Sequence, residues 1–172
     1  LIYCIVWVYA TRMEKMMRKI LVLGLGNTLL GDEGVGVRVI ERLAEENLIP
    51  NVELMDGGTL SFTLAGPIAE ADQLIVVDAA NLQAESGSVQ AFVNEEMDHF
   101  IGTGKMSSVH EVSLLDLLSI TALSGELPTS RALVGVQPEF VDWSEALTPA
   151  VEKGVEQAVD EVKRLLKEWT DE

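Results

Sequence analysis

Residues 20–36, ILVLGLGNTLLGDEGVG, constrain this chain most, because they predict a buried strand, a glycine-containing loop and a helix start in direct succession. The apolar run over 19–25 has no polar alternation, which is typical of a strand in a parallel sheet. Asp32 could cap the helix that we expect over about 33–47. A phosphate-binding loop would carry glycines there, whereas Asp32 and Glu33 repel phosphate and attract cations. We therefore expect this turn to hold a metal.

The rest of the chain alternates between predicted strands and helices. A capping box, Ser108 to Glu111, predicts the start of a helix that runs to about residue 123. Thr148 is expected to cap the last helix, which has a continuous apolar stripe made of Val151, Val155, Val159, Val162, Leu166 and Trp169. This alternation predicts an α/β fold with a mostly parallel sheet of about five strands and helices on both faces. Ligands of such folds bind at the carboxyl ends of the strands. The other strands are expected at 52–55, 73–77, 89–93 and 131–136, and a further helix at 61–70.

Composition limits the partners and the compartment. The 172 residues carry a net charge of −16, which disfavours binding to nucleic acid or to anionic membranes. Cys4 is the only cysteine, which excludes a disulfide framework and a cysteine-rich zinc site and favours a cytoplasmic protein. We expect one domain over 17–172, and a monomer.

The first sixteen residues do not fit this domain. They begin with Leu1 and contain about ten apolar residues in a row, too few to span a bilayer. They also lack the basic region and the cleavage site of a signal peptide. Because MRKILVLG from Met17 is an ordinary start for a first strand, we expect residues 1–16 to be a non-native or mis-started leader.

Three residues of metal-ligand type are expected at one edge of the sheet. Glu33 follows the first strand, Asp78 ends the third, and His110 is expected in the first turn of the helix after the loop at 102–108. One imidazole and two carboxylates suit a divalent metal such as zinc or nickel. Each residue also has an ordinary structural interpretation: a helix-start acid, a turn residue and a helix-start polar residue. His99 follows no predicted strand end and is expected at the surface.

Other chemistries lack their residues. Gly24 and Gly26 begin a dinucleotide fingerprint, but Leu29 stands where its third glycine belongs. The chain has no Walker lysine, no serine elbow and no zincin histidine pair.

The chain resembles the maturation endopeptidases of nickel–iron hydrogenases, from Met17 to about Leu166. The motifs that carry this resemblance occur in order: GLGNTLLGDEGVGVR at 24–38, DGGT at 56–59, VVDA at 76–79, SVHEVSLLDLL at 108–118, VGVQPE at 134–139 and LTPAVE at 147–152. The resemblance implies a three-layer fold with a twisted sheet between two helical layers. It also implies removal of a C-terminal extension from the large-subunit precursor after nickel insertion.

The resemblance assigns roles to five residues. Glu33, Asp78 and His110 match the residues that contact the precursor's nickel, so the metal is a recognition mark rather than a permanent cofactor. Asp32 and Asp56 match acids that are important for activity, and either could be the general base for an attacking water.

Two other functions stay open. The same three ligands would serve a nickel carrier or sensor that holds the precursor without cutting it. A nucleotide-binding oxidoreductase would use the loop at 24–26.

Overall fold

The computed structural model describes residues 18–46, 48, 50–104, 106 and 113–171. The predicted leader and His110 lie outside these residues. The described helices are α2 (Val35–Leu43), α3 (Ala65–Ala69), α4 (Glu95–Gly102), α5 (Leu114–Leu123) and α6 (Pro149–Asp171), with 3-10 helices η1 (Gly31–Gly34) and η2 (Phe62–Leu64). The strands are β1 (Ile20–Leu25), β2 (Val52–Gly58), β3 (Gln73–Ala79), β4 (Val89–Val93) and β5 (Ser130–Val136).

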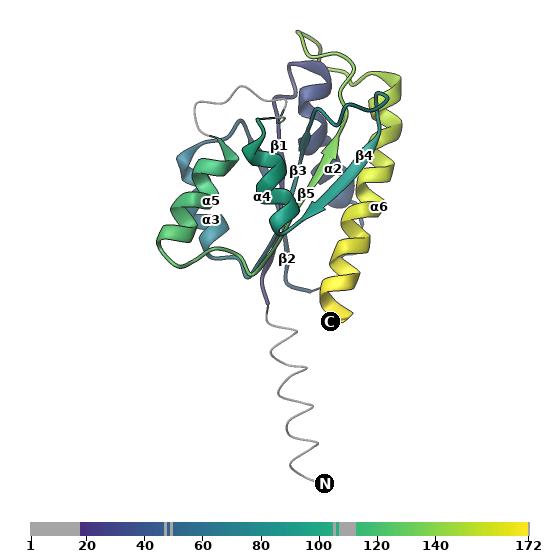
Figure 1. Cartoon of the computed structure of the whole chain (residues 1–172). Helices are drawn as coiled ribbons and strands as arrows, with labels where there is room; N and C mark the ends of the chain where they lie inside the picture. The colour runs from purple at the N-terminus through teal and green to yellow at the C-terminus, as the bar shows by residue number, and fades with distance from the viewer. Residues whose placement is uncertain (1–17, 47, 49, 105, 107–112, 172) are drawn as a thin grey trace.

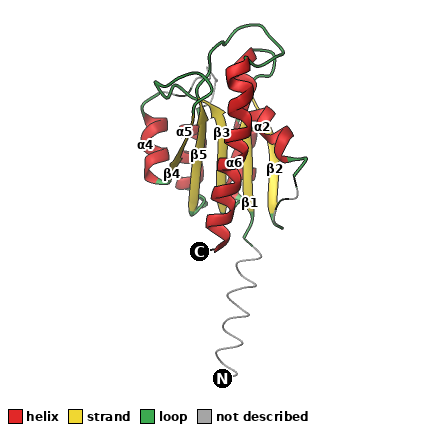
Figure 2. Cartoon of the chain, turned by 90° about the vertical axis from the view of Figure 1, so that its right-hand side faces the viewer, coloured by secondary structure: helices red, strands yellow, loops and turns green. Residues whose placement is uncertain are grey.

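The five strands form one sheet in the order β2-β1-β3-β5-β4. Four strands are parallel, and β4 pairs with β5 in the antiparallel direction at the edge. Figures 1 and 2 show the sheet between helices on both sides, so the predicted three-layer α/β fold is confirmed.

Each face of the sheet has its own apolar core. Helices α2 and α6 cover one face, and α3, α4 and α5 cover the other (Figure 1). The apolar stripe predicted for α6 is confirmed, because its members from Val151 to Trp169 are buried against the strands. Side chains alternate along β1, with Val22 facing α2 and α6 and Leu23 facing the other core.

Several predicted element boundaries need correction. Strand β2 continues through Asp56 to Gly58, and β3 includes Asp78, so both acids lie within strands rather than after them. Helix α4 was not predicted. Helix α5 begins at Leu114, after a capping box made by Ser113 and Asp116, so it does not start at residue 108.

The new start of α5 follows from local hydrogen bonds. The Asp116 backbone N–H donates to Ser113 Oγ at 3.1 Å, and the Ser113 N–H donates to the Asp116 carboxylate at 3.0 Å. The pKa of Asp116 is lowered by the hydrogen bonds that the Ser113 hydroxyl, at 2.7 Å, and the Ser113 N–H donate to its carboxylate. The predicted box at 108–111 lies outside the described residues.

Candidate active site

Glycines let the start of α2 lie directly against the carboxyl ends of the central strands. A Cβ atom on Gly36 would lie 2.2 Å from the Val77 carbonyl oxygen. A Cβ atom on Gly26, whose φ is +128°, would lie 1.8 Å from the Glu33 carbonyl oxygen. Both contacts are impossible for other residues, so these glycines hold the η1 turn close to the strands.

Asp32 lies in η1 and is fully buried. Its Oδ1 accepts a hydrogen bond from the Thr148 N–H at 2.7 Å. Its Oδ2 accepts from the backbone N–H groups of Glu139 and Phe140, both at 2.9 Å, and from the Thr148 hydroxyl at 3.0 Å. Asp32 therefore does not cap α2, whose N-cap is Gly34. It fixes the loop between β5 and α6 instead.

Glu33, the next residue, has the opposite environment. Its side chain is 5% exposed, and Oε2 has no hydrogen-bond partner among the described residues. Burial raises the pKa of the Glu33 carboxyl, and a hydrogen bond from the Asn27 backbone opposes part of that rise. A buried carboxylate oxygen without a donor is costly unless a proton or a cation meets it. Glu33 is therefore the described residue best suited to contact a cation.

Asp78 is fully buried near the carboxyl end of β3. Its Oδ1 accepts a hydrogen bond from the Ala79 N–H at 2.8 Å. The η1 helix, which carries Glu33, packs against β3. Both acids therefore belong to neighbouring elements at the carboxyl edge of the sheet, as the sequence predicted.

The complete three-ligand set stays a prediction, because His110 lies outside the described residues. Within the part of the chain that the structure describes, no group of three or more His, Cys, Asp or Glu side chains is arranged to hold a metal ion. His99, expected at the surface, is exposed on α4.

Asp56 is exposed and lines a polar pocket of about 310 Å³. Its Oδ1 accepts a hydrogen bond from the Gly58 N–H at 2.8 Å. The other lining residues come from the loop after β1, the end of β2 and α2: Gly26, Asn27, Thr28, Val37, Gly58 and Thr59. Asn27 also bonds to the Glu33 carboxyl, so this loop connects the pocket with Glu33.

Strand register relates the acids to one another. Gly24 of β1 pairs with Asp56 on one side and with Val77, the neighbour of Asp78, on the other. The backbones of β2 and β3 are thus two strand spacings apart, roughly 10 Å. Strand alternation directs Asp56 toward the α2 face and Asp78 toward the opposite face, so the two carboxylates approach the edge from different sides.

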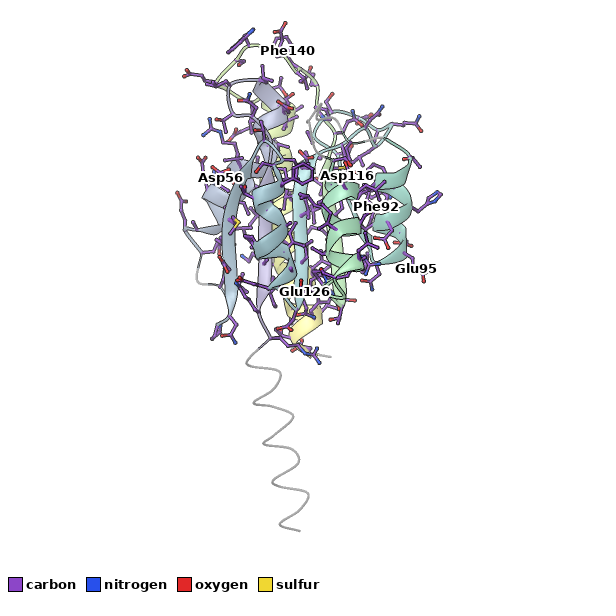
Figure 3. The ribbon with its side chains drawn as sticks, turned by 90° about the vertical axis from the view of Figure 1, so that its left-hand side faces the viewer. Asp56, Phe92, Glu95, Asp116, Glu126 and Phe140 are labelled. Carbon is purple, nitrogen blue, oxygen red and sulfur yellow. The ribbon has the colours of Figure 1, made fainter. Side chains whose placement is uncertain are left out.

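The sequence did not predict a role for the loop between β5 and α6. Figure 3 shows Phe140 on this loop, beyond the carboxyl edge near which Asp56 lies. Large apolar residues of the loop are exposed, and the segment EFVDWSE interleaves them with acids. Three large apolar side chains in so short a connection are the signal that could have identified it.

A comparison with known protein families identifies the family of this chain. The family model for hydrogenase maturation proteases matches residues 37–165. The chain belongs to the hydrogenase maturation protease family. It is therefore a member of a peptidase family, in agreement with the resemblance found in the sequence.

Individual members of the hydrogenase maturation protease family match most of the chain. The hydrogenase 2 maturation protease of Escherichia coli K12 is 39% identical over 151 residues, which are 87% of this chain and 92% of that protein. The hydrogenase expression/formation protein HupD of Rhodobacter capsulatus is 39% identical over 153 residues, 88% of this chain and 72% of HupD. The structure of the hydrogenase maturating endopeptidase HybD from E. coli has a TM-score of 0.80, covering 87% of this chain and 93% of HybD at 39% identity.

Among the described residues, no helix combines the length and apolar character needed to cross a membrane.

Proposed function

We propose that this protein is an endopeptidase that removes a C-terminal extension from the nickel-loaded large subunit of a nickel–iron hydrogenase. The observation that carries the proposal is the buried Glu33 carboxyl, one oxygen of which has no hydrogen-bond partner among the described residues. Glu33 lies in η1, which packs against β3, the strand that contains Asp78. In this proposal the precursor's nickel is part of the substrate. Glu33, Asp78 and His110 contact it, which positions the tail for cleavage. The cytoplasm, where we place the protein, is where the precursor would be processed.

A water molecule then attacks the scissile carbonyl, and we assign Asp56 as the general base that takes its proton. The water oxygen enters the new carboxyl group, and the proton passes to the departing amine. Asp56 is exposed in a polar pocket, so water and a peptide can reach it. Both oxygens of Asp32 already accept hydrogen bonds in a buried position, which favours anchoring over proton transfer for that acid.

Trimming assays with nickel-loaded and nickel-free precursor test the proposal. We expect the protein to trim the nickel-loaded form and to leave the nickel-free form intact, because Glu33 needs the cation. Equal trimming of both forms would refute recognition through nickel. In the same assay, Asp56→Asn should bind the precursor but slow trimming by roughly 100-fold or more, whereas Asp160→Asn, an exposed acid on α6, should behave as wild type. A wild-type protein that binds nickel-loaded precursor without ever releasing the tail would identify a carrier instead.

A further inference from the structure

The loop between β5 and α6 exposes an apolar surface beside the candidate active site. Trp143 is 78% exposed, and Phe140 and Val141 are nearly half exposed. Leu29, in the loop after β1, is also nearly half exposed. We call these four residues, Leu29, Phe140, Val141 and Trp143, the rim patch. Trp and Phe at this exposure are unusual on a free surface and frequent in protein interfaces.

Backbone hydrogen bonds join the two halves of the rim patch. The Ser144 N–H donates to the Leu29 carbonyl at 3.0 Å, and the Gly31 N–H donates to the Ser144 carbonyl at 2.7 Å. The Asp32 N–H donates to the Phe140 carbonyl at 3.0 Å. The loop therefore pairs with residues 29–32 along their length, and the patch is one continuous feature.

The same bonds make the rim patch adjacent to Glu33. Phe140 bonds through its backbone to Asp32, the residue before Glu33. The four hydrogen bonds that the Asp32 carboxylate accepts hold the loop in place. The backbone that carries the exposed aromatic side chains is therefore held in place by these hydrogen bonds. A fixed apolar surface loses little entropy on binding.

The charges on the loop indicate the chemistry of the partner. Exposed Glu139, Asp142 and Glu145 alternate with the apolar residues, and none of their carboxylates forms an ion pair among the described residues. This acidic surface, on a chain of net charge −16, repels a second copy of itself and an anionic membrane. It attracts a segment that combines apolar side chains with lysine or arginine.

We infer that the rim patch is the docking surface for the hydrogenase precursor, and that it binds an apolar and basic segment of that protein. This inference rests on the proposed function. A precursor whose nickel contacts Glu33 also lies next to Phe140, because the Phe140 carbonyl accepts a hydrogen bond from Asp32, the residue before Glu33. The rim patch supplies affinity, and the acids at the edge of the sheet supply the chemistry.

Trimming kinetics of nickel-loaded precursor test the inference. Trp143→Ala should raise KM by about 10- to 30-fold and leave kcat unchanged, since interface tryptophans often dominate binding. The matched control is Leu123→Ala at the end of α5, whose side chain is 90% exposed but remote from η1. It should leave KM within about twofold of the wild-type value. Both side chains are exposed, so neither change should alter Tm.

Binding can also be followed without cleavage, by 19F NMR of protease labelled with 5-fluorotryptophan. The chain has three tryptophans, Trp7, Trp143 and the buried Trp169, whose signals are assigned by Trp→Phe variants. Nickel-loaded precursor should shift the Trp143 signal and leave the Trp169 signal in place.

Each contrary outcome has a distinct meaning. Normal trimming with an unshifted Trp143 signal and an unchanged KM for Trp143→Ala would overturn the docking surface alone. If the Trp143 signal shifts when the protease is concentrated by itself, the occupant of the rim patch is a second copy of the chain and not the precursor. Failure of the wild type to bind or trim nickel-loaded precursor would overturn the proposed function, and with it this inference.

Discussion

Asp32 and Glu33 are adjacent acids in one short 3-10 helix, yet the hydrogen bonding of their carboxyl groups is opposite. The Asp32 carboxylate accepts four hydrogen bonds, whereas one oxygen of the Glu33 carboxylate has no partner among the described residues. Both are buried, so both lose contact with water. A buried charge with donors stabilises the fold, and a buried charge without them is retained at a cost in stability. The comparison favours a structural role for Asp32 and supports the role that we propose for Glu33.

The largest expected effect is the loss of activity on changing Glu33. Glu33→Gln should lower kcat/KM for nickel-loaded precursor by at least about 100-fold, because even indirect partners of a metal contribute 10- to 100-fold. Its Tm at pH 7 should not fall below that of the wild type, because burial disfavours the ionised form of the Glu33 carboxyl and the amide of the variant carries no charge. Trimming assays and thermal unfolding measure the two effects.

Glu45→Gln is the matched control for this change. Glu45 is exposed just beyond the end of α2, so the variant should keep both activity and Tm. A Glu33→Gln protein that trims normally would remove Glu33 from the site.

The second effect is on stability, and it should be specific to Asp32. Asp32→Asn replaces one acceptor oxygen with an NH₂ group that faces hydrogen-bond donors. We expect a loss of about 2–3 kcal/mol, which lowers Tm by roughly 5–10 °C in a protein of this size. Thermal unfolding of Asp32→Asn and Glu33→Gln makes the comparison direct, since the chemical change is the same at consecutive positions. Equal Tm values for the two variants would show that the difference in hydrogen bonding between Asp32 and Glu33 does not affect stability.

The fold was largely predictable because its signals are local. Apolar runs predicted all five strands, and the stripe from Val151 to Trp169 predicted the buried face of α6. Helix α4 escaped because its sequence, EEMDHFIG, has only one short apolar cluster and no N-terminal capping side chain. The start of α5 was misplaced because Ser108 and Ser113 both precede an acid three residues on, and sequence alone does not choose between them.

The positions of Glu33 and Asp78 at the carboxyl edge of the sheet were predictable, whereas the contacts of Asp32 were not. The position of Asp78 at the carboxyl edge follows from its place at the end of an apolar run, which predicts a strand of a parallel sheet. The role of Asp32 does not, because its partners Glu139, Phe140 and Thr148 lie more than a hundred residues away. Local rules assign an acid at a helix start to capping, and only the folded chain brings the competing donors to it.

The smallest expected effect is the pH dependence that Glu33 contributes to stability. Burial raises the pKa of Glu33 above its ordinary value of 4.5, so the folded protein keeps its proton at pH values where the unfolded chain has lost it. The contribution of Glu33 to stability therefore falls as pH rises above about 4.5, until the folded carboxyl has also ionised. The Glu33→Gln variant does not lose stability in this way, because its side chain does not ionise. Its free energy of unfolding, measured by urea titration, should match the wild type near pH 4, exceed it increasingly above pH 4.5, and then keep a constant advantage. A difference between the two proteins that is flat from pH 4 to 8, or that favours the wild type at high pH, would mean that donors compensate Glu33 as fully as they compensate Asp32.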